Sequence, residues 1–163
     1  MASQSSRRMQ ASGLQAHTGY WLNRLRGLVH AGFEAALASR DVSIAQWSVL
    51  ITVYRGDAVT PGDVARVIDI DAGALTRLIN RLEAKGLLRR VPMPDDRRSL
   101  HLELTERAVS ITPGLAALAD ENDKAFFGAL SGDEQATFRH LLAKLLHSRG
   151  VDVPASWTET VDS

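Results

Sequence analysis

The side chains best suited to binding chemistry lie between Arg77 and Arg98, where basic residues dominate. This stretch holds seven basic and three acidic residues, namely Arg77, Arg81, Lys85, Arg89, Arg90, Arg97 and Arg98 against Glu83, Asp95 and Asp96. From residue 113 to residue 163 the balance reverses, with four basic and eight acidic residues. The whole chain has 19 basic and 19 acidic residues, so only their distribution indicates a partner. A basic middle and an acidic end describe a polarised molecule whose middle could meet an anion.

A helix expected to begin at Asp71 presents part of this basic stretch. Leu75, Leu78, Ile79 and Leu82 form its apolar face, and the major groove of B-DNA admits a helix of this kind. The small residues of the first turn, Ala72, Gly73 and Ala74, would let the helix backbone come close to the DNA. Arg77 and Arg81 are four positions apart and therefore share a helix face, from which they could reach phosphates or a guanine edge. The alternative is an ordinary amphipathic helix with a solvated basic side. The residues predicted to contact DNA from the helices are Thr60, Asp71, Ala72, Gly73, Thr76, Arg77, Asn80 and Arg81.

The segment MPDDRRSLHLELTERA, residues 93–108, places four charges at the tip of a predicted hairpin. Strands are expected at residues 87–91 and 99–105, because apolar and polar residues alternate there. A narrow minor groove attracts arginine. Asp96 stands two positions before Arg98 and could form an ion pair that orients the Arg98 guanidinium toward the minor groove. Arg97 would then make an additional contact with the same groove. The alternative is a turn whose charges only keep it solvated.

Capping residues and turns divide the remainder into helices. The helices are expected at residues 14–39, from Ser43 to Gly56, from Thr60 to about residue 69, from Asp71 to Gly86, from Thr105 onward with a kink or interruption at Pro113-Gly114, and from a Ser131–Glu134 capping box to the last leucines. The fold class predicted is therefore mainly α, with the order α-α-α-α-β-β-α-α. A helix-turn-helix with a two-stranded wing forms the centre, and helices from both ends form a dimerisation region.

The stretch IDAGALTRLINRLEAKGLLRRVPMPDDRRSLHLELTERA resembles the DNA-binding core of the MarR family of bacterial transcriptional regulators. The family's wing pattern is Asp-x-Arg, three free positions and Leu-x-Leu-Thr, and it falls on Asp96, Arg98, Leu102, Leu104 and Thr105. The segment ALTRLINRLEAKGLL matches the family's helix pattern. The specific likeness covers about residues 60–108, and the flanking helices agree in order and length. The resemblance implies a winged-helix homodimer in which the first helix and the last two interlock.

The terminal helices support a dimer independently of the resemblance, because their apolar stripes exceed what one small winged core can cover. Two recognition helices about 34 Å apart would then read a pseudo-palindromic operator. We accordingly expect one chain, residues 1–163, with a DNA-binding lobe at 43–106. Dimerisation helices are expected at 13–40 and 107–149, and flexible tails at 1–12 and 151–163.

Many relatives of this family are repressors released by small aromatic acids, and the resemblance implies a ligand site between the dimerisation helices and the DNA-binding lobe. The residues that could line it here are His17, Tyr20, Trp21, Arg24 and Trp47. Aromatic walls with one or two cations suit an aromatic carboxylate. The alternative is that the two tryptophans fill the core and that Arg24 pairs with an acid.

Several classes of function find no support in the sequence. The chain has no cysteine, which excludes disulfides and thiol chemistry. It has no glycine-rich phosphate loop, HExxH or G-x-S-x-G motif, and its five histidines are scattered. We therefore expect no enzyme activity, no cofactor and no metal. A signal peptide and an apolar run of roughly 18 residues are both lacking, so we expect a cytoplasmic protein without a membrane partner.

Together these features favour a homodimeric transcriptional repressor that a small aromatic carboxylate releases from a double-stranded DNA operator. Two alternatives stay open within DNA binding, an activator and a regulator without a ligand. A third alternative is a helical protein–protein interaction module whose basic wing only solubilises the chain.

Overall fold

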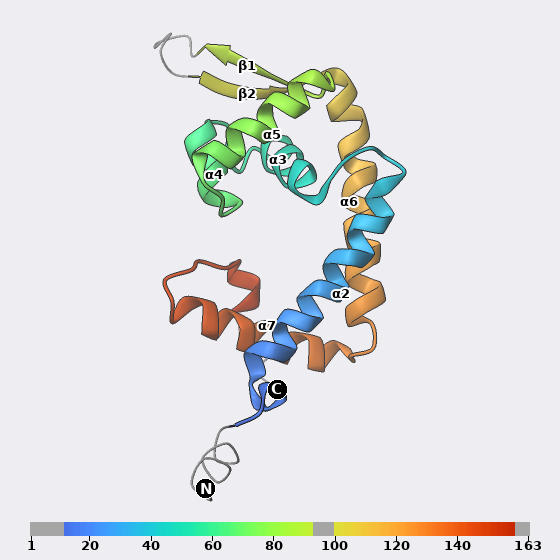
Figure 1. The fold of residues 1–163 in the computed structure, drawn as a ribbon, viewed down its shortest axis with the longest axis vertical. Helices are drawn as coiled ribbons and strands as arrows, with labels where there is room; N and C mark the ends of the chain where they lie inside the picture. The colour runs from blue at the N-terminus through green and yellow to red at the C-terminus, as the bar shows by residue number, and fades with distance from the viewer. Residues whose placement is uncertain (1–11, 93–99, 159–163) are drawn as a thin grey trace, which may run out of the picture. The chain divides into compact units, whose positions relative to one another are not determined.

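A computed structural model describes residues 12–92 and 100–158 of the chain (Figure 1). Its elements, in order, are η1 (Leu14–Ala16), α2 (Thr18–Ala38), α3 (Ile44–Arg55), α4 (Pro61–Val67), α5 (Ala72–Ala84), β1 (Leu88–Pro92), β2 (Leu100–Leu104), α6 (Glu106–Phe127), α7 (Gly132–His147) and η2 (Ala155–Trp157). The predicted fold class, mainly helical with a helix-turn-helix and a two-stranded wing, is confirmed. The chain divides after Asn122 into two compact units, which are described separately.

Side-chain caps begin the three helices of the central lobe, as the sequence predicted. Ser43, Thr60 and Asp71 each accept a hydrogen bond from the backbone N–H three positions on, at 3.2, 3.2 and 2.8 Å. Gly56 and Gly86 follow α3 and α5 with φ angles of 74° and 65°, a left-handed conformation that glycine adopts without steric cost. Local hydrogen bonding therefore sets where the helix-turn-helix begins and ends.

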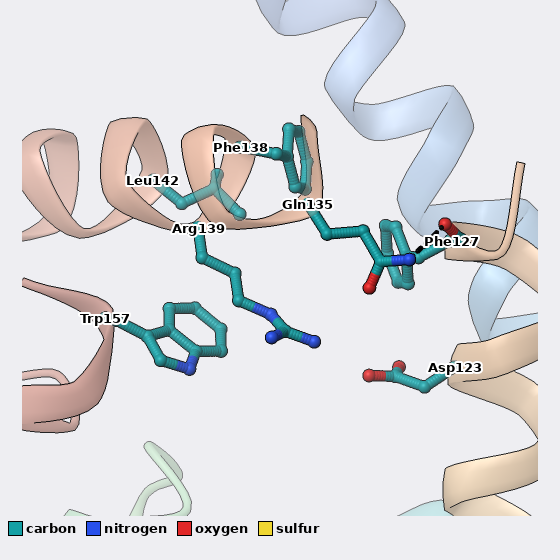
Figure 2. A pocket seen from close by; sticks show the side chains of 7 residues that line it. All are labelled: Asp123, Phe127, Gln135, Phe138, Arg139, Leu142 and Trp157. Carbon is teal, nitrogen blue, oxygen red and sulfur yellow. Dashed lines mark hydrogen bonds between the residues drawn. The ribbon is translucent and has the colours of Figure 1, made fainter. Parts of the chain in front are cut away.

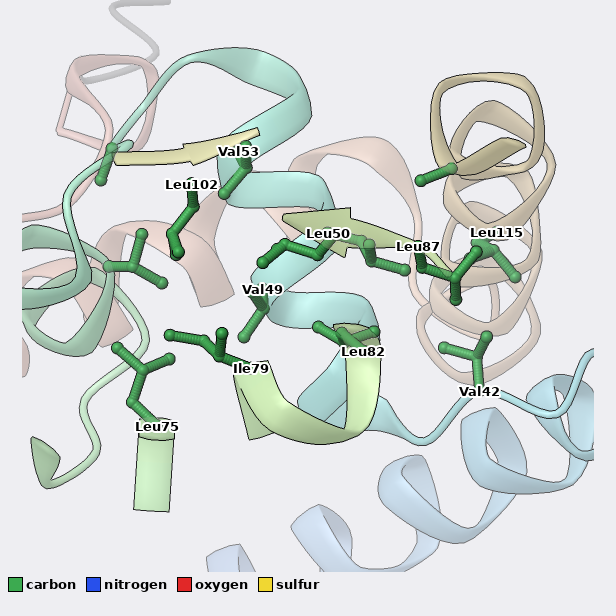
Figure 3. Packing of buried hydrophobic residues seen from close by; sticks show 14 of the residues in the cluster. Val42, Val49, Leu50, Val53, Leu75, Ile79, Leu82, Leu87, Leu102 and Leu115 are labelled. Atoms are coloured by element: carbon green, nitrogen blue, oxygen red, sulfur yellow. The ribbon is translucent and has the colours of Figure 1, made fainter. Parts of the chain in front are cut away.

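One apolar cluster holds the first unit together (Figure 3). The strands pair antiparallel, with Leu88 opposite Leu104 and Pro92 opposite Leu100. The backbone N–H of Leu102 also donates to the carbonyl of Val59 at 2.7 Å, which ties the wing to the segment before α4. The largest fully buried side chains of the cluster come from α2, α3, α4, α5, the hairpin and α6, and they include Leu37, Leu50, Val64, Leu75, Leu82, Leu102 and Leu115.

One expectation about the long helices was wrong in detail, and another was wrong in part. The first helix begins at Thr18 rather than Leu14, because His17 has extended backbone, with φ −95° and ψ 123°, after the short turn η1. Leu14 is exposed, so no packing compensates for extending the helix. Pro113 does not interrupt α6. Thr112 and Leu115 are buried on either side of it, and this packing offsets the one backbone hydrogen bond that proline removes.

The second unit consists of the end of α6, helix α7 and the short turn η2. The predicted capping box is confirmed: Ser131 Oγ accepts from the Glu134 backbone, and Glu134 Oε2 accepts from the Ser131 backbone at 2.8 Å. Phe127 and Phe138 lie with their ring centroids 5.8 Å apart (Figure 2). Of the helices in the described residues, none combines the length and apolar character needed to cross a membrane.

Candidate nucleic-acid interface

Helix α5 has one buried and one exposed face, and the predicted contact residues occupy the exposed one. Leu75, Ile79 and Leu82 are no more than 2% exposed. The seven predicted residues of the other face are all exposed, namely Asp71, Ala72, Gly73, Thr76, Arg77, Asn80 and Arg81. An amphipathic helix anchored in this way can present a polar face to a groove without loosening the core.

Thr60 differs from the other predicted contact residues, because it is half-buried and engaged inside the lobe. Its hydroxyl donates to Asp63 Oδ2 at 2.6 Å and also accepts from the Asp63 backbone. The pKa of Asp63 lies below its ordinary value, chiefly because of this hydrogen bond and secondly because Arg66 bonds to the same carboxylate. Thr60 is therefore a helix cap, and its hydroxyl proton is already used within the protein.

Three residues of the exposed face are also held by intramolecular hydrogen bonds. Asp71 caps the helix at 2.8 Å, and the Thr76 hydroxyl donates to the carbonyl of Ala72 at 2.8 Å. Asn80 Oδ1 accepts from Arg90 of β1 at 2.6 Å. The Asn80 bond connects α5 to β1 of the wing, a link that the sequence did not reveal.

Arg77 lies back over the first turn of α5. A Cβ atom placed on Gly73 would come 3.6 Å from Arg77 Nη1 and 3.1 Å from Asp71 Oδ1. A side chain at position 73 would therefore contact the Arg77 guanidinium at an ordinary van der Waals distance and would require the Asp71 carboxylate to move slightly.

Most of the predicted positive charge in residues 77–92 is neutralised within the protein. Lys85 pairs with Asp41, Arg89 with Glu103 and Arg90 with Glu83. Among the residues that the structure describes, Arg77 and Arg81 make no ion pair. Arg81 lines an open groove together with the acidic residues Glu34 and Asp41, among others. Arg77 is thus the strongest candidate on α5 for binding an anion.

The base of the wing carries a chain of charged hydrogen bonds. Arg89 Nη2 lies 2.6 Å from Glu103 Oε2 across the sheet, and His101 Nε2 lies 2.7 Å from Glu103 Oε1. The bond from His101, followed by the bond from Arg89, holds the pKa of Glu103 below its ordinary value of 4.5. The opposed positions of Arg89 and Glu103 could have been found from the hairpin register. The predicted tip residues Asp96, Arg97 and Arg98 lie outside the described residues.

Comparison with known proteins identifies the group to which this architecture belongs. A model of the MarR family matches residues 40–99. The multiple antibiotic resistance protein MarR of Escherichia coli strain K12 is 33% identical over 111 residues, which are 68% of this chain and 77% of that protein. The chain belongs to the MarR family. Its curated relatives are transcriptional regulators, so the predictions of a DNA-binding regulator and of no enzyme are confirmed.

Solved structures of MarR-family proteins agree with this assignment. A mutant of MarR from E. coli complexed with operator DNA is 31% identical, covers 78% of this chain and 92% of its own, and gives a TM-score of 0.72. A structure of BpsR from Bordetella bronchiseptica, whose DNA binding is regulated by 6-hydroxynicotinic acid, is 25% identical, with coverage of 83% and 96% and a TM-score of 0.76.

In this MarR-family chain, four of the five predicted ligand residues lie together on α2 or at its start. The rings of Tyr20 and Trp21 meet edge to face, with centroids 5.0 Å apart. Arg24 Nη1 donates to the Tyr20 hydroxyl at 3.2 Å, and the Trp21 indole donates to the carbonyl of Gln15 at 2.8 Å. His17 is the N-cap residue just before them, and its Nε2 lies 3.3 Å from Ser12 Oγ.

Trp47 does not join this group within one chain. Its ring packs edge to face on Phe33, with a centroid separation of 4.9 Å. Phe33 lies twelve residues beyond Trp21, which corresponds to about 18 Å along a helix. The Trp47 indole N–H is buried and has no hydrogen-bond partner among the described residues. The predicted ligand residues thus fall into two places in one chain. His17, Tyr20, Trp21 and Arg24 form a group at the start of α2, and Trp47 lies apart from them beside Phe33.

Hydrogen bonds tie the C-terminal end of α5 to the turn after α2 and to the start of α6. Lys85 Nζ donates to the backbone carbonyl of Asp41 and lies 3.1 Å from Asp41 Oδ1, in the turn between α2 and α3. Arg107 of α6 donates to the carbonyl of Lys85 at 2.8 Å, and Thr105 donates to the carbonyl of Gly86 at 2.8 Å. We call these contacts the Lys85 junction. Sequence reasoning missed them, because Asp41 and Lys85 are 44 residues apart.

Proposed function

We propose that this protein is a homodimeric repressor that binds a pseudo-palindromic operator through α5 and the wing. The observation that carries the proposal is the exposed face of α5. There Arg77, unpaired among the described residues, lies beside Gly73 and Ala72 on a helix whose other face is fixed in the core. Small residues allow the backbone to approach a groove, and an unpaired guanidinium can bind phosphate or a guanine edge. The operator complex of a related MarR supports the same use of the fold.

A second copy of the chain would cover apolar side chains that one copy leaves in water. On α2 these are Trp21, Leu22, Leu25 and Leu28, and on α7 they are Leu141, Leu145 and Leu146. Exposed apolar patches of this kind mark interaction surfaces. A twofold dimer buries the same patch of each copy and presents two recognition helices, which matches the symmetry of a pseudo-palindrome.

A small aromatic acid would release this repressor by binding near the α2 group of Tyr20, Trp21 and Arg24. The rings supply apolar walls, and the guanidinium supplies a partner for a carboxylate. The related BpsR is regulated by an aromatic acid, 6-hydroxynicotinic acid. A ligand can shift DNA affinity only if it prefers one arrangement of the dimer. The Lys85 junction offers a route by which movement of α2 or α6 could reach the recognition helix.

The DNA-binding proposal is tested by fluorescence anisotropy with the promoter fragment upstream of the protein's own gene. Binding should be saturable and should weaken as salt rises, because counterions are released from the phosphates. Arg77→Ala should cost about 1–3 kcal/mol of binding free energy if Arg77 reads a base, and the preference should relax at one position only. Arg55→Ala is the matched control, because Arg55 already pairs with Asp57.

Two results would contradict parts of the proposal. If no saturable binding occurs even at low salt, the operator model fails, and the helical interaction module becomes the better interpretation. If a reporter driven by the bound promoter falls when the protein is removed, the protein is an activator and not a repressor.

The effector is tested separately by a thermal-shift screen of aromatic carboxylates. Trp21→Ala should abolish the shift caused by a binding acid, whereas Trp47→Ala should lower the unfolding midpoint but keep the shift. The reverse pattern would place the effector beside Phe33 and Trp47.

A further inference from the structure

Asn80 lies on the exposed face of α5, and an arginine of the wing determines how its amide group is turned. Arg90 Nη2 of β1 donates to Asn80 Oδ1 at 2.6 Å. The guanidinium of arginine has only hydrogen-bond donors, so the amide atom that faces it has to be the oxygen. The amide nitrogen of Asn80 is left for another partner, and it has none in the described part of the chain.

Arg90 is itself held in place by Glu83, which lies on the same helix as Asn80. Glu83 Oε1 accepts from the Arg90 backbone N–H at 3.1 Å, and Glu83 Oε2 accepts from Arg90 Nη1. The Arg90 N–H lies on the edge of β1 that β2 does not cover, so Glu83 satisfies a donor that the hairpin leaves open. Both charged side chains are half-buried. The orientation of the Asn80 amide is therefore fixed by a group that has little freedom to move.

This group of three side chains is electrically neutral, because Arg90 and Glu83 form an ion pair. Asn80 therefore presents an uncharged donor, whereas Arg77 presents a charged one. Asn80 lies eight positions after Ala72, the first residue of α5, which corresponds to about 12 Å along the helix axis. The N-terminal residues of a recognition helix contact base edges. A donor this far along α5 is better placed for the DNA backbone, whose phosphate oxygens accept hydrogen bonds.

We propose that Asn80 donates a hydrogen bond to a DNA phosphate, and that Arg90 is the positioning residue that leaves the amide nitrogen free to do so. The proposal rests on the proposed operator binding through α5. Asparagine reads adenine by using its oxygen and its nitrogen together. In this protein Arg90 engages the oxygen, so the nitrogen alone faces the DNA. A phosphate contact positions the protein on the duplex without reading sequence, so Asn80 contributes to affinity and not to base preference.

Three variants separate the donor from the link between α5 and the wing. Asn80→Ala removes both. Asn80→Asp keeps an oxygen for Arg90 but has no donor, and Arg90→Met keeps the donor but loses the link. Asn80→Asp and Arg90→Met each lower the net charge of the lobe by one, so a general charge effect would weaken DNA binding equally in these two variants. Fluorescence anisotropy of the full-length protein with the promoter fragment upstream of its own gene measures the affinity of each variant.

We expect Asn80→Ala to weaken operator binding about tenfold, because it loses a hydrogen bond to a charged phosphate. Asn80→Asp should weaken binding further, because its carboxylate repels the phosphate. Arg90→Met should have the smallest effect of the three, because the donor remains and only its orientation is lost. The control is Asn23→Asp, the same replacement in an exposed asparagine of α2 that accepts from Arg26 at 3.3 Å, and it should bind operator like the unmodified chain.

Two results would overturn the proposal while leaving operator binding intact. If Asn80→Asp binds the operator as tightly as the unmodified chain, or more tightly than Arg90→Met, then Asn80 only links α5 to the wing. If Asn80→Ala relaxes the preference at one base pair, the contact is to a base and not to a phosphate. Circular dichroism and the thermal unfolding midpoint check folding, and Arg90→Gln, with the same change of charge, replaces Arg90→Met if that variant does not fold. Absence of DNA binding by the unmodified chain would instead refute the proposed function, and this proposal with it.

Discussion

Leucine side chains differ in exposure between the winged lobe and the helices α2 and α7. In the lobe Leu50 and Leu82 have no exposed surface, and Figure 3 shows them surrounded by other apolar residues. On α2 Leu28 is 59% exposed, and on α7 Leu145 is 61% exposed. The largest side chains of the lobe core are thus buried within one chain, whereas α2 and α7 leave leucine side chains exposed.

This difference indicates how the two regions contribute to stability. A buried leucine contributes about 1.5–3 kcal/mol by leaving water when the chain folds. A leucine exposed in one chain contributes only when a second molecule covers it, so its contribution depends on protein concentration. Substitutions in the two regions should therefore differ in kind as well as in size.

Leu50→Ala should have the largest effect on stability. Removing this buried side chain should lower the free energy of unfolding by about 2–5 kcal/mol, measured by urea denaturation. The loss should be the same at every protein concentration. Leu145→Ala is the contrasting variant, and it should lower the unfolding midpoint mainly at protein concentrations at which the unmodified chain dimerises, with little loss in dilute solution. A loss for Leu145→Ala that equals the loss for Leu50→Ala in dilute solution would show that the two regions do not differ as described.

Replacing both Leu141 and Leu145 with glutamate should weaken the proposed dimer most strongly. Two charges on this face would have to be desolvated on association, so the dimer dissociation constant should rise by a factor on the order of a hundred. Operator affinity should fall with it, because the second recognition helix is no longer tethered to the first. Analytical ultracentrifugation measures the first effect. Lys144→Glu adds negative charge at an exposed position on the same helix, and this control should leave association nearly unchanged. If the dimer persists in the double variant, the face of α7 that carries Leu141 and Leu145 is not the dimer interface.

The lobe was more predictable from sequence than the terminal helices, for a physical reason. The caps at Ser43, Thr60, Asp71 and Ser131 involve partners three residues away, so residue type and spacing suffice to find them. The start of α2 was predicted four residues too early, because Leu14 continues the apolar stripe in the sequence. The stripe itself does not show whether any other part of the protein packs against Leu14. Pro113 was expected to kink or interrupt α6, and the helix is not interrupted there, because the local rule takes no account of the buried residues beside it.

The sequence predicted which residues form the candidate interface. It did not predict which of their side chains are already paired or hydrogen-bonded within the protein. From the sequence Arg77 and Arg81 ranked equally as candidates, and only the structure places Arg81 in a groove that Glu34, Asp41 and Lys85 also line. Arg90 counted as free positive charge, although it pairs with Glu83 and bonds to Asn80. Such pairs join distant parts of the chain, and their existence depends on tertiary packing that local spacing does not encode.

Lys85→Met should have a moderate effect that distinguishes coupling from simple stability. It removes the hydrogen bonds to Asp41 and to Gln46 Oε1, the latter at 3.3 Å. We expect a loss of about 0.5–1.5 kcal/mol per hydrogen bond in unfolding free energy. If the junction transmits the effector signal, operator binding without effector should persist, while its release by effector should diminish. Lys124→Met, an exposed lysine in the other unit, is the control, and an unchanged effector response in folded Lys85→Met would exclude this coupling route.

Acidification should produce the smallest effect, and it should appear separately in the two regions. The pKa of Glu103 is held below 4.5, first by His101 and then by Arg89. The pKa of Glu134 is held below 4.5 by the backbone and side chain of Ser131. A carboxylate whose pKa is lower in the folded chain stabilises it above the unfolded value of about 4.5. That contribution is lost as the pH falls below 4.5 through the folded pKa.

Amide hydrogen exchange can resolve this acid effect by region, after correction for the intrinsic pH dependence of exchange. Between pH 5 and pH 3, protection should fall in β2 because of Glu103 and in the first turn of α7 because of Glu134. Glu103→Gln should remove the pH-dependent loss in β2 and leave that in α7, and Glu134→Gln should do the reverse. If either substitution abolished both losses, the lobe and the terminal helices would open as one cooperative unit, and the contrast between them would hold for packing but not for local stability.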